Sequence, residues 1–87
     1  MRLEVMLFGP LRTFGDGRAV EIEVRDGASV VEAREALVAA LERLRPGAGA
    51  RALVARSVLA TEQEVLAEDT PLRPGASLAV LPPVCGG

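Results

Sequence analysis

The stretch SVVEAREALVAALERL, residues 29–44, decides the fold of this chain. Ser29 is followed three residues later by Glu32, which is the pattern of a capping box at the first turn of a helix. Beyond it, apolar residues recur at spacings of three and four, and charged residues cover much of the remaining surface. The apolar stripe comprises Val30, Ala33, Leu37, Leu41 and Leu44, flanked by Val38 and Ala40. The spacing predicts an amphipathic helix that ends at Arg45-Pro46-Gly47 and lies across a sheet.

Two stretches of alternating polarity precede the helix. Residues 2–8 place Leu3, Val5 and Leu7 on one face, and Arg2, Glu4, Met6 and Phe8 on the other. Residues 19–25 place Val20, Ile22 and Val24 on one face. Alternation of this kind is typical of half-buried strands. The connection, a loop over residues 11–17 with Asp16-Gly17 as a turn signal, is short, so an antiparallel hairpin is expected.

The residues after the helix are expected to supply the other strands. Residues 52–56 are interpreted as a short strand, with either Leu53 or Val54 inward, and residues 57–68 as two short edge strands around a turn. A bend over residues 69–72 should bury Leu72. Residues 76–81 form the last strand, with Leu78 and Val80 on one face and Ala79 and Leu81 on the other. Proline cannot donate to a ladder, so Pro82 ends this strand.

This order of elements predicts an α+β domain of two layers. It matches the ubiquitin-like β-grasp arrangement, a mixed sheet of about four or five strands packed on one main helix, with the final strand beside the first. Residues 1–81 are expected to form the domain, and residues 82–87 an extended tail that leaves from the middle of the sheet.

The composition excludes several classes of function. The net charge is −2, whereas nucleic-acid binders carry a clustered basic face. Histidine is absent and Cys85 is the single cysteine, so Cys-His and Ser-His-Asp chemistry is excluded and a metal site is not expected. No apolar run approaches the ~20 residues that cross a bilayer. We therefore expect a cytoplasmic protein that is not an enzyme on its own.

The last six residues are Pro82, Pro83, Val84, Cys85, Gly86 and Gly87. The prolines favour extended backbone, and the terminal glycines have no side chain. Such a segment can thread a narrow channel and present the carboxylate of Gly87 to the active site of another protein. A frayed end is the alternative interpretation of Gly-Gly taken alone. For Cys85, an exposed small residue is favoured over a redox role.

A partner interface is the second candidate site. Met6, Phe8, Ala79 and Leu81 share the outer face of the sheet if the first and last strands are neighbours, and an exposed apolar patch usually marks an interface. The alternatives are a loop that covers the patch, or a strand assignment displaced by one residue. Arg12 is interpreted either as a charged rim contact or as a solvated loop arginine.

The chain resembles the small subunit of molybdopterin synthase (the MoaD type), within the wider group of ubiquitin-like sulfur carriers. The resemblance covers the whole chain. It rests on Val5-Met6-Leu7-Phe8 followed by Leu11-Arg12, on Ser29-Val30, on Thr70-Pro71-Leu72, and on Leu81-Pro82-Pro83-Val84 leading to Gly86-Gly87. The sequence departs from the family at Pro74-Gly75-Ala76-Ser77 and at Ala55-Arg56, where turn chemistry is affected more than the tail.

The resemblance implies a mechanism for molybdenum cofactor biosynthesis. An E1-like adenylyltransferase would use ATP and Mg to adenylate Gly87, and a sulfur donor such as a cysteine desulfurase or a rhodanese would convert it to a thiocarboxylate. The large synthase subunit would then accept the tail and pass sulfur to a pterin precursor. The resemblance implies that this chain binds no cofactor itself and that Met6, Phe8, Arg12, Ala79 and Leu81 contact partners.

Three alternatives stay open. The chain is a sulfur carrier for another pathway, such as tRNA thiolation or thiazole or cysteine synthesis; a ubiquitin-like protein modifier joined through Gly87 to lysines; or a plain β-grasp binding module. The two prolines and the chain length favour the molybdopterin pathway.

Overall fold

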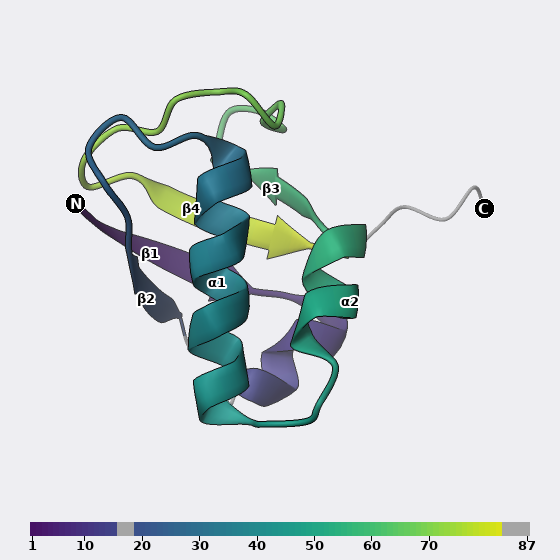
Figure 1. Cartoon of the computed structure of the whole chain (residues 1–87). Coiled ribbons are helices and arrows are strands. Elements are labelled where there is room, and N and C mark those ends of the chain that lie inside the picture. Colours follow the sequence, from purple (N-terminus) through teal and green to yellow (C-terminus); the bar gives the residue numbers. More distant parts are fainter. Residues whose placement is uncertain (16–18, 83–87) are drawn as a thin grey trace.

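The computed structural model describes residues 1–15 and 19–82, which form a sheet with helices on one side of it (Figure 1). The elements in order are β1 (Arg2–Leu7), the 3-10 helix η1 (Gly9–Phe14), β2 (Val20–Glu23), α1 (Val30–Leu44), α2 (Ala50–Arg56), β3 (Val58–Ala60) and β4 (Ser77–Leu81). Within the described part of the chain the sheet has four strands in the order β2-β1-β4-β3. β1 and β4 are parallel, and the other two pairs are antiparallel. The predicted β-grasp arrangement is therefore confirmed.

The strands bury the residues that their alternation predicts. Leu3, Val5 and Leu7 of β1 are buried, as are Leu78 and Val80 of β4. In the register of the two parallel strands Val5 lies beside Leu78, and Leu7 beside Val80, so these side chains share one face. That face packs against α1, and each buried aliphatic side chain contributes about 1.5–3 kcal/mol of transfer free energy.

Helix α1 begins where the capping box predicts. The Ser29 backbone N–H donates to Oε2 of Glu32 at 3.0 Å, and the helix starts at the next residue. The predicted stripe is buried along Val30, Ala33, Leu37, Val38, Ala40 and Leu41. The prediction is wrong for Leu44, which is 53% exposed. The buried stripe thus ends one turn before the helix does.

Residues 67–72 close over the first turn of α1. The N–H groups of Val30 and Val31 donate to the carbonyls of Thr70 and Glu68, both at 3.1 Å. The Leu72 N–H donates to the Ala28 carbonyl at 2.8 Å, and the Leu72 side chain is buried, as its bend predicts. The bonds from Val30 and Val31 satisfy two donors that have no partner inside the helix.

The predicted strand over residues 52–56 is wrong, because Ala50–Arg56 is the helix α2. Three of its seven residues are alanine, the best helix former, and only Val54 is β-branched. Ala50 and Val54, four residues apart, are the buried pair. Their spacing is helical, which resolves the ambiguity between Leu53 and Val54 in favour of Val54.

Two connecting segments also differ from expectation. The predicted loop over residues 11–17 begins with η1, whose buried residues Leu11 and Phe14 have the three-residue period of a 3-10 helix. In residues 57–68 only the first expected strand, β3, forms. The second is reduced to an isolated bridge between Ala60 and Val65. A pairing of one residue cannot propagate as a strand.

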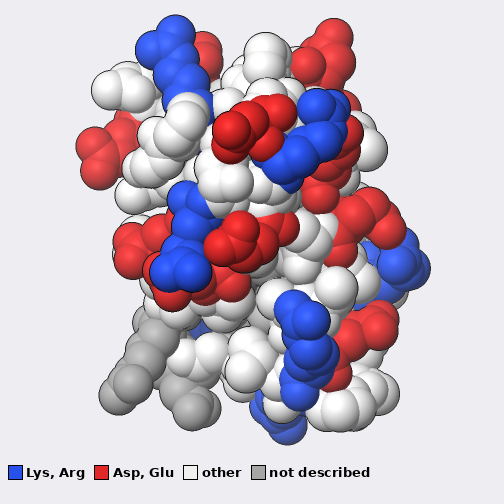
Figure 2. Space-filling model, turned by 60° about the vertical axis from the view of Figure 1, so that its left-hand side comes forward, with Lys and Arg blue, Asp and Glu red and all other residues white. Residues whose placement is uncertain are grey.

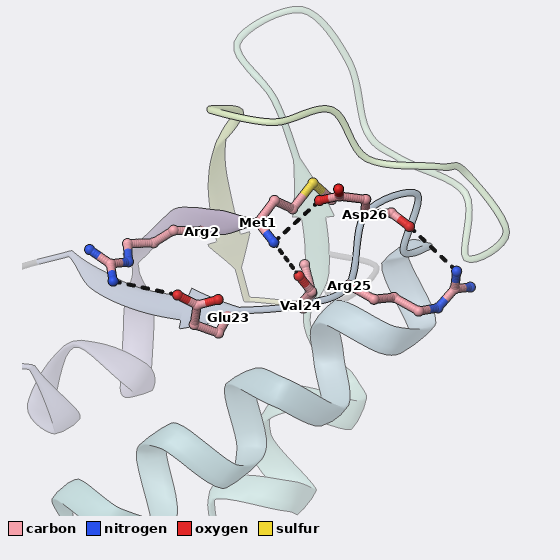
Figure 3. A network of polar contacts seen from close by, with 6 residues as sticks. All are labelled: Met1, Arg2, Glu23, Val24, Arg25 and Asp26. Carbon is pink, nitrogen blue, oxygen red and sulfur yellow. Dashed lines mark hydrogen bonds and ion pairs between the residues drawn. The ribbon is translucent and has the colours of Figure 1, made fainter.

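The N-terminus is tied to the end of β2 (Figure 3). The Met1 amine donates to the Val24 carbonyl and lies 3.5 Å from Oδ1 of Asp26, while the Val24 N–H donates to the Met1 carbonyl at 2.9 Å. These bonds extend the β1–β2 pairing beyond the strands themselves. Because β1 and β4 are parallel, the N-terminus lies at one end of the sheet and Leu81 at the other (Figure 1).

Candidate functional site

The outer face of the sheet, opposite α1, carries an apolar patch over β1, β4 and β3. The register brings Met6 beside Ala79, Ala79 beside Ala60, and Leu81 beside Val58, and paired residues point to the same face. Phe8 follows β1 in extended backbone and so continues the alternation from Met6. We call these six residues, Met6, Phe8, Val58, Ala60, Ala79 and Leu81, the apolar patch.

The patch is open to solvent at its large side chains. Met6 is 47% exposed and Phe8 is 38% exposed. They line a hollow of about 180 Å³ together with Ala79, Thr61 and Glu62. This volume is below that of ordinary small-molecule sites, about 300–1,000 Å³, and suits a side chain of a partner protein. A larger hollow, about 470 Å³ between residues 61–66 and 70–73, contains none of the predicted site residues.

Charged residues occupy the other half of the same face. Arg2 lies opposite Glu23 and Glu4 opposite Glu21 in the β1–β2 register. Nη2 of Arg2 is 3.4 Å from Oε1 of Glu23 (Figure 3). Acidic and basic side chains also lie interspersed on the side of the molecule shown in Figure 2, with no clustered basic surface there. The outer face of the sheet is therefore divided into a charged half at the start of β1 and an apolar half at its end.

The apolar half lies at the end of the sheet from which the C-terminal segment departs. Leu81 is the last residue of β4, a central strand, and the exposed Pro82 follows it. Pro83, Val84, Cys85, Gly86 and Gly87, predicted to enter a partner's active site, lie outside the described residues. Arg12 is exposed on η1 but does not line the hollow, so its rim contact stays a prediction.

The patch holds no group equipped for catalysis. Among residues 1–15 and 19–82, no three acidic or cysteine side chains gather into a possible metal site. The carboxyls whose pKa is lowered are Glu32 and Glu68, hydrogen-bonded to Arg25 and Arg34 respectively, and the Glu35 carboxylate raises the pKa of Arg51. These are ion pairs of α1, α2 and the loops. The described helices include none long and apolar enough to span a membrane.

Sequence reasoning missed two members of the patch. Val58 and Ala60 face outward because β3 pairs antiparallel with β4. The signal was present as Val58-Leu59-Ala60, in which Leu59 belongs to the core cluster, whereas Ala60, although only 5% exposed, lies outside that cluster and lines the hollow. Three residues are too few for alternation to identify a face.

A mixed sheet whose last strand lies beside the first, with one main helix across it, defines a ubiquitin-like β-grasp protein. The sequence specifies which one: the model of the ThiS family matches residues 5–87, so the chain belongs to the ThiS family. The resemblance to ubiquitin-like sulfur carriers is thereby confirmed. Among curated proteins none matches the chain.

Solved structures of similar proteins cover the whole fold. SAMP1 from Haloferax volcanii, a small archaeal modifier protein, is 30% identical over 100% of both chains, with a TM-score of 0.73. Subunit 1 in a complex of subunits 1 and 2 of the molybdopterin-converting factor from Helicobacter pylori is 27% identical over 100% of both chains, with a TM-score of 0.58. A putative molybdopterin converting factor subunit 1 from Pyrococcus furiosus covers 97% of this chain and 99% of its own at 22% identity and a TM-score of 0.70, and supports the fold alone.

Proposed function

We propose that this protein is the sulfur-carrying small subunit of a molybdopterin synthase. One observation carries the proposal: the central strand β4 ends at Leu81 beside the apolar patch, and the sequence Pro-Pro-Val-Cys-Gly-Gly follows. A partner that covers the patch would find the C-terminal segment starting at the edge of its contact area. The likeness to subunit 1 of the Helicobacter pylori complex supports a large subunit as that partner.

The chemistry assigned to this chain is limited to its terminal carboxylate. A carboxylate is a poor acyl donor, and an E1-like adenylyltransferase with ATP and Mg would activate Gly87 by attaching AMP. A sulfur donor, such as a cysteine desulfurase or a rhodanese, would then attack through the outer sulfur of a persulfide and release AMP. A second thiol would reduce the resulting acyl disulfide, which releases the thiocarboxylate and leaves a disulfide on the donor. The absence of histidine from the sequence is compatible with this role, because the carrier supplies neither acid nor base. The chain would act as a non-catalytic subunit and bind no cofactor.

The patch would serve as the docking surface for both partners in turn. Met6 and Phe8 provide exposed apolar area on its β1 side, and the hollow between them and Thr61 offers a place for a partner's side chain. A few side chains that become fully desolvated on association carry most of the binding free energy of protein interfaces. The same surface cannot hold the activating enzyme and the large subunit at once, so the carrier would travel between them.

A protein modifier is the second candidate. The observation that favours it is the likeness to SAMP1, whose identity to this chain, 30%, exceeds that of either molybdopterin-converting factor. A modifier would also be adenylated at Gly87, but its activated carboxyl group would then be joined to the amine of a lysine on a target protein. Carriers for tRNA thiolation or for thiazole or cysteine synthesis share the first two steps and differ in the acceptor.

Mass spectrometry of the untagged protein, co-expressed with its host's activating enzyme and sulfur donor, tests the proposal. We expect one oxygen of Gly87 to be replaced by sulfur. Fragment ions must place the change at the C-terminus, because oxidation of Met1 or Met6 adds nearly the same mass. A variant lacking Gly86 and Gly87 is the control and should stay unmodified. A bare carboxylate with no AMP adduct in the intact chain would refute the carrier role, and high-mass conjugates would favour the modifier.

A further inference from the structure

Gly9 and Pro82 lie at the same end of the sheet, directly after the two central strands. β1 and β4 run parallel, and their last paired residues are Leu7 and Val80. Gly9 lies two residues after Leu7, and Pro82 lies two residues after Val80. After β1 the backbone turns into η1, whereas after β4 it continues toward the C-terminus.

The two residues approach each other closely because Gly9 has no side chain. A Cβ atom placed on Gly9 would lie 3.1 Å from both Cβ and Cγ of Pro82 and 3.4 Å from Cδ. Gly9 also has φ of 62°, in the left-handed region that favours glycine. Four other glycines among the described residues share a positive φ, namely Gly27, Gly47, Gly49 and Gly75, and none of them would meet any atom within 4 Å.

The close contact between Gly9 and Pro82 is therefore not a consequence of the positive φ of Gly9. The turn into η1 requires the positive φ, as turns elsewhere in the chain do. The contact with the proline ring adds a second requirement, since a Cβ on residue 9 would stand 3.1 Å from the ring of Pro82 and would displace the ring by a few tenths of an ångström. Pro82 is the last described residue before the C-terminal segment.

We propose that Gly9 is a positioning residue that seats the ring of Pro82 and so sets the direction in which residues 83–87 leave the sheet. The proposal rests on the carrier function proposed above for Gly87. Pro82 precedes another proline, and such a residue is confined to extended backbone, so the orientation of its ring is passed on to the next peptide unit. Five residues reach at most about 17 Å, over which a rotation of about 20° at Pro82 would displace the terminus by about 6 Å. A displacement of that size removes a carboxylate from an active site.

The test compares Gly9→Ala with Gly47→Ala, a matched control. Both substitutions place a Cβ at positive φ, but only the first meets Pro82. Cys85 is the single cysteine, so a nitroxide attached to it reports where the tail lies through the broadening of backbone amide signals of the domain. We expect Gly9→Ala to change the pattern of broadened amides and Gly47→Ala to leave the wild-type pattern. Pro82→Ala, which removes most of the ring, serves as a second variant if Gly9→Ala does not fold, and should also change the pattern.

A kinetic measurement with the activating enzyme, on unlabelled protein, connects the tail direction to function. We expect Gly9→Ala to lower kcat for formation of the AMP adduct about ten- to hundredfold with KM within about twofold, because docking is kept and the reacting group is misplaced. Gly47→Ala should match the wild type. Broadening patterns that stay unchanged in both Gly9→Ala and Pro82→Ala, or an unchanged kcat, overturn the inference. If the pattern changes but the wild type never accepts AMP or sulfur, positioning by Gly9 is supported and the carrier function fails.

Discussion

The guanidinium of Arg34 binds both carboxylate oxygens of Glu68, with Nε 2.7 Å from Oε1 and Nη2 2.7 Å from Oε2. Its remaining nitrogen, Nη1, donates to the carbonyl of Val54 at 2.6 Å. One side chain of α1 thus connects α2 and the loop that closes over the first turn of α1. The Arg34 side chain is only 17% exposed, although Glu68 is 51% exposed. Two-point pairs of this kind are stronger and more directional than a single ion contact.

We expect Arg34→Lys to lower the free energy of unfolding by about 1–2 kcal/mol, because a lysine ammonium cannot make the two parallel bonds or reach Val54 as well. Arg51→Lys is the matched control. Arg51 also pairs with a carboxylate, that of Glu35, but both side chains are exposed, so Arg51→Lys should leave the urea midpoint close to that of the wild type. Urea unfolding measures both. Equal midpoints for the two variants would contradict the structural role of Arg34.

The same pair predicts how stability depends on pH. The hydrogen bond from Arg34 lowers the pKa of Glu68 below its ordinary value of 4.5. The unfolded chain therefore binds the proton more readily, and stability rises with pH through this range. The contribution of the pair is fully present above pH ~4.5 and is lost as pH falls through the lower pKa of the folded state.

Glu68→Gln should accordingly flatten the acid side of the stability curve below about pH 5, while lowering stability at pH 7. Thermal unfolding at a series of pH values measures the slope. Glu62→Gln, which removes an exposed carboxyl outside this contact, is the control and should retain the wild-type slope. An acid slope in Glu68→Gln as steep as that of the wild type would show that other carboxyls carry it.

The parts of the fold that could be predicted from sequence are those with a repeated local signal. Alternation over residues 2–8 identified β1, and the capping box identified the start of α1. In α2, by contrast, the decisive fact is that Ala50 and Val54 are buried together, which depends on packing as much as on residue type. A segment of seven residues contains too few turns for its period to be recognised.

The candidate site likewise contains residues that the sequence predicts and residues that only the strand pairing reveals. Alternation places Met6 on the outer face without any structure, because a strand has only two faces. Val58 can be assigned to the apolar patch only from the pairing of β3 with β4. The close approach of Gly9 to Pro82 likewise follows only from the parallel register of β1 with β4. Both pairings join residues nineteen or more positions apart, for which neither period nor propensity gives a signal.

The apolar patch predicts a loss of partner binding. Phe8→Asp or Leu81→Asp should weaken binding to the host's large synthase subunit at least about tenfold, since each places an unpaired carboxylate in the contact area. Val31→Asp is the control, because Val31 is exposed on α1 and an acid is favourable in the first turn of a helix. Isothermal titration measures the affinities, and circular dichroism verifies the fold. Wild-type affinity in both folded patch variants would exclude the patch as the docking surface.

Cys85→Ser distinguishes a passive tail from one in which the thiol takes part. Cys85 stands two residues before Gly87, near enough in sequence for its thiol to react with sulfur carried at the terminus. A carrier whose chemistry is confined to the terminal carboxylate does not need that thiol. We therefore expect Cys85→Ser to form the thiocarboxylate and transfer sulfur at the wild-type rate, within about twofold in kcat/KM. The measurement is single-turnover sulfur transfer to the acceptor under reducing and non-reducing conditions. A loss of about tenfold or more in the serine-substituted carrier would assign the thiol a role in the transfer.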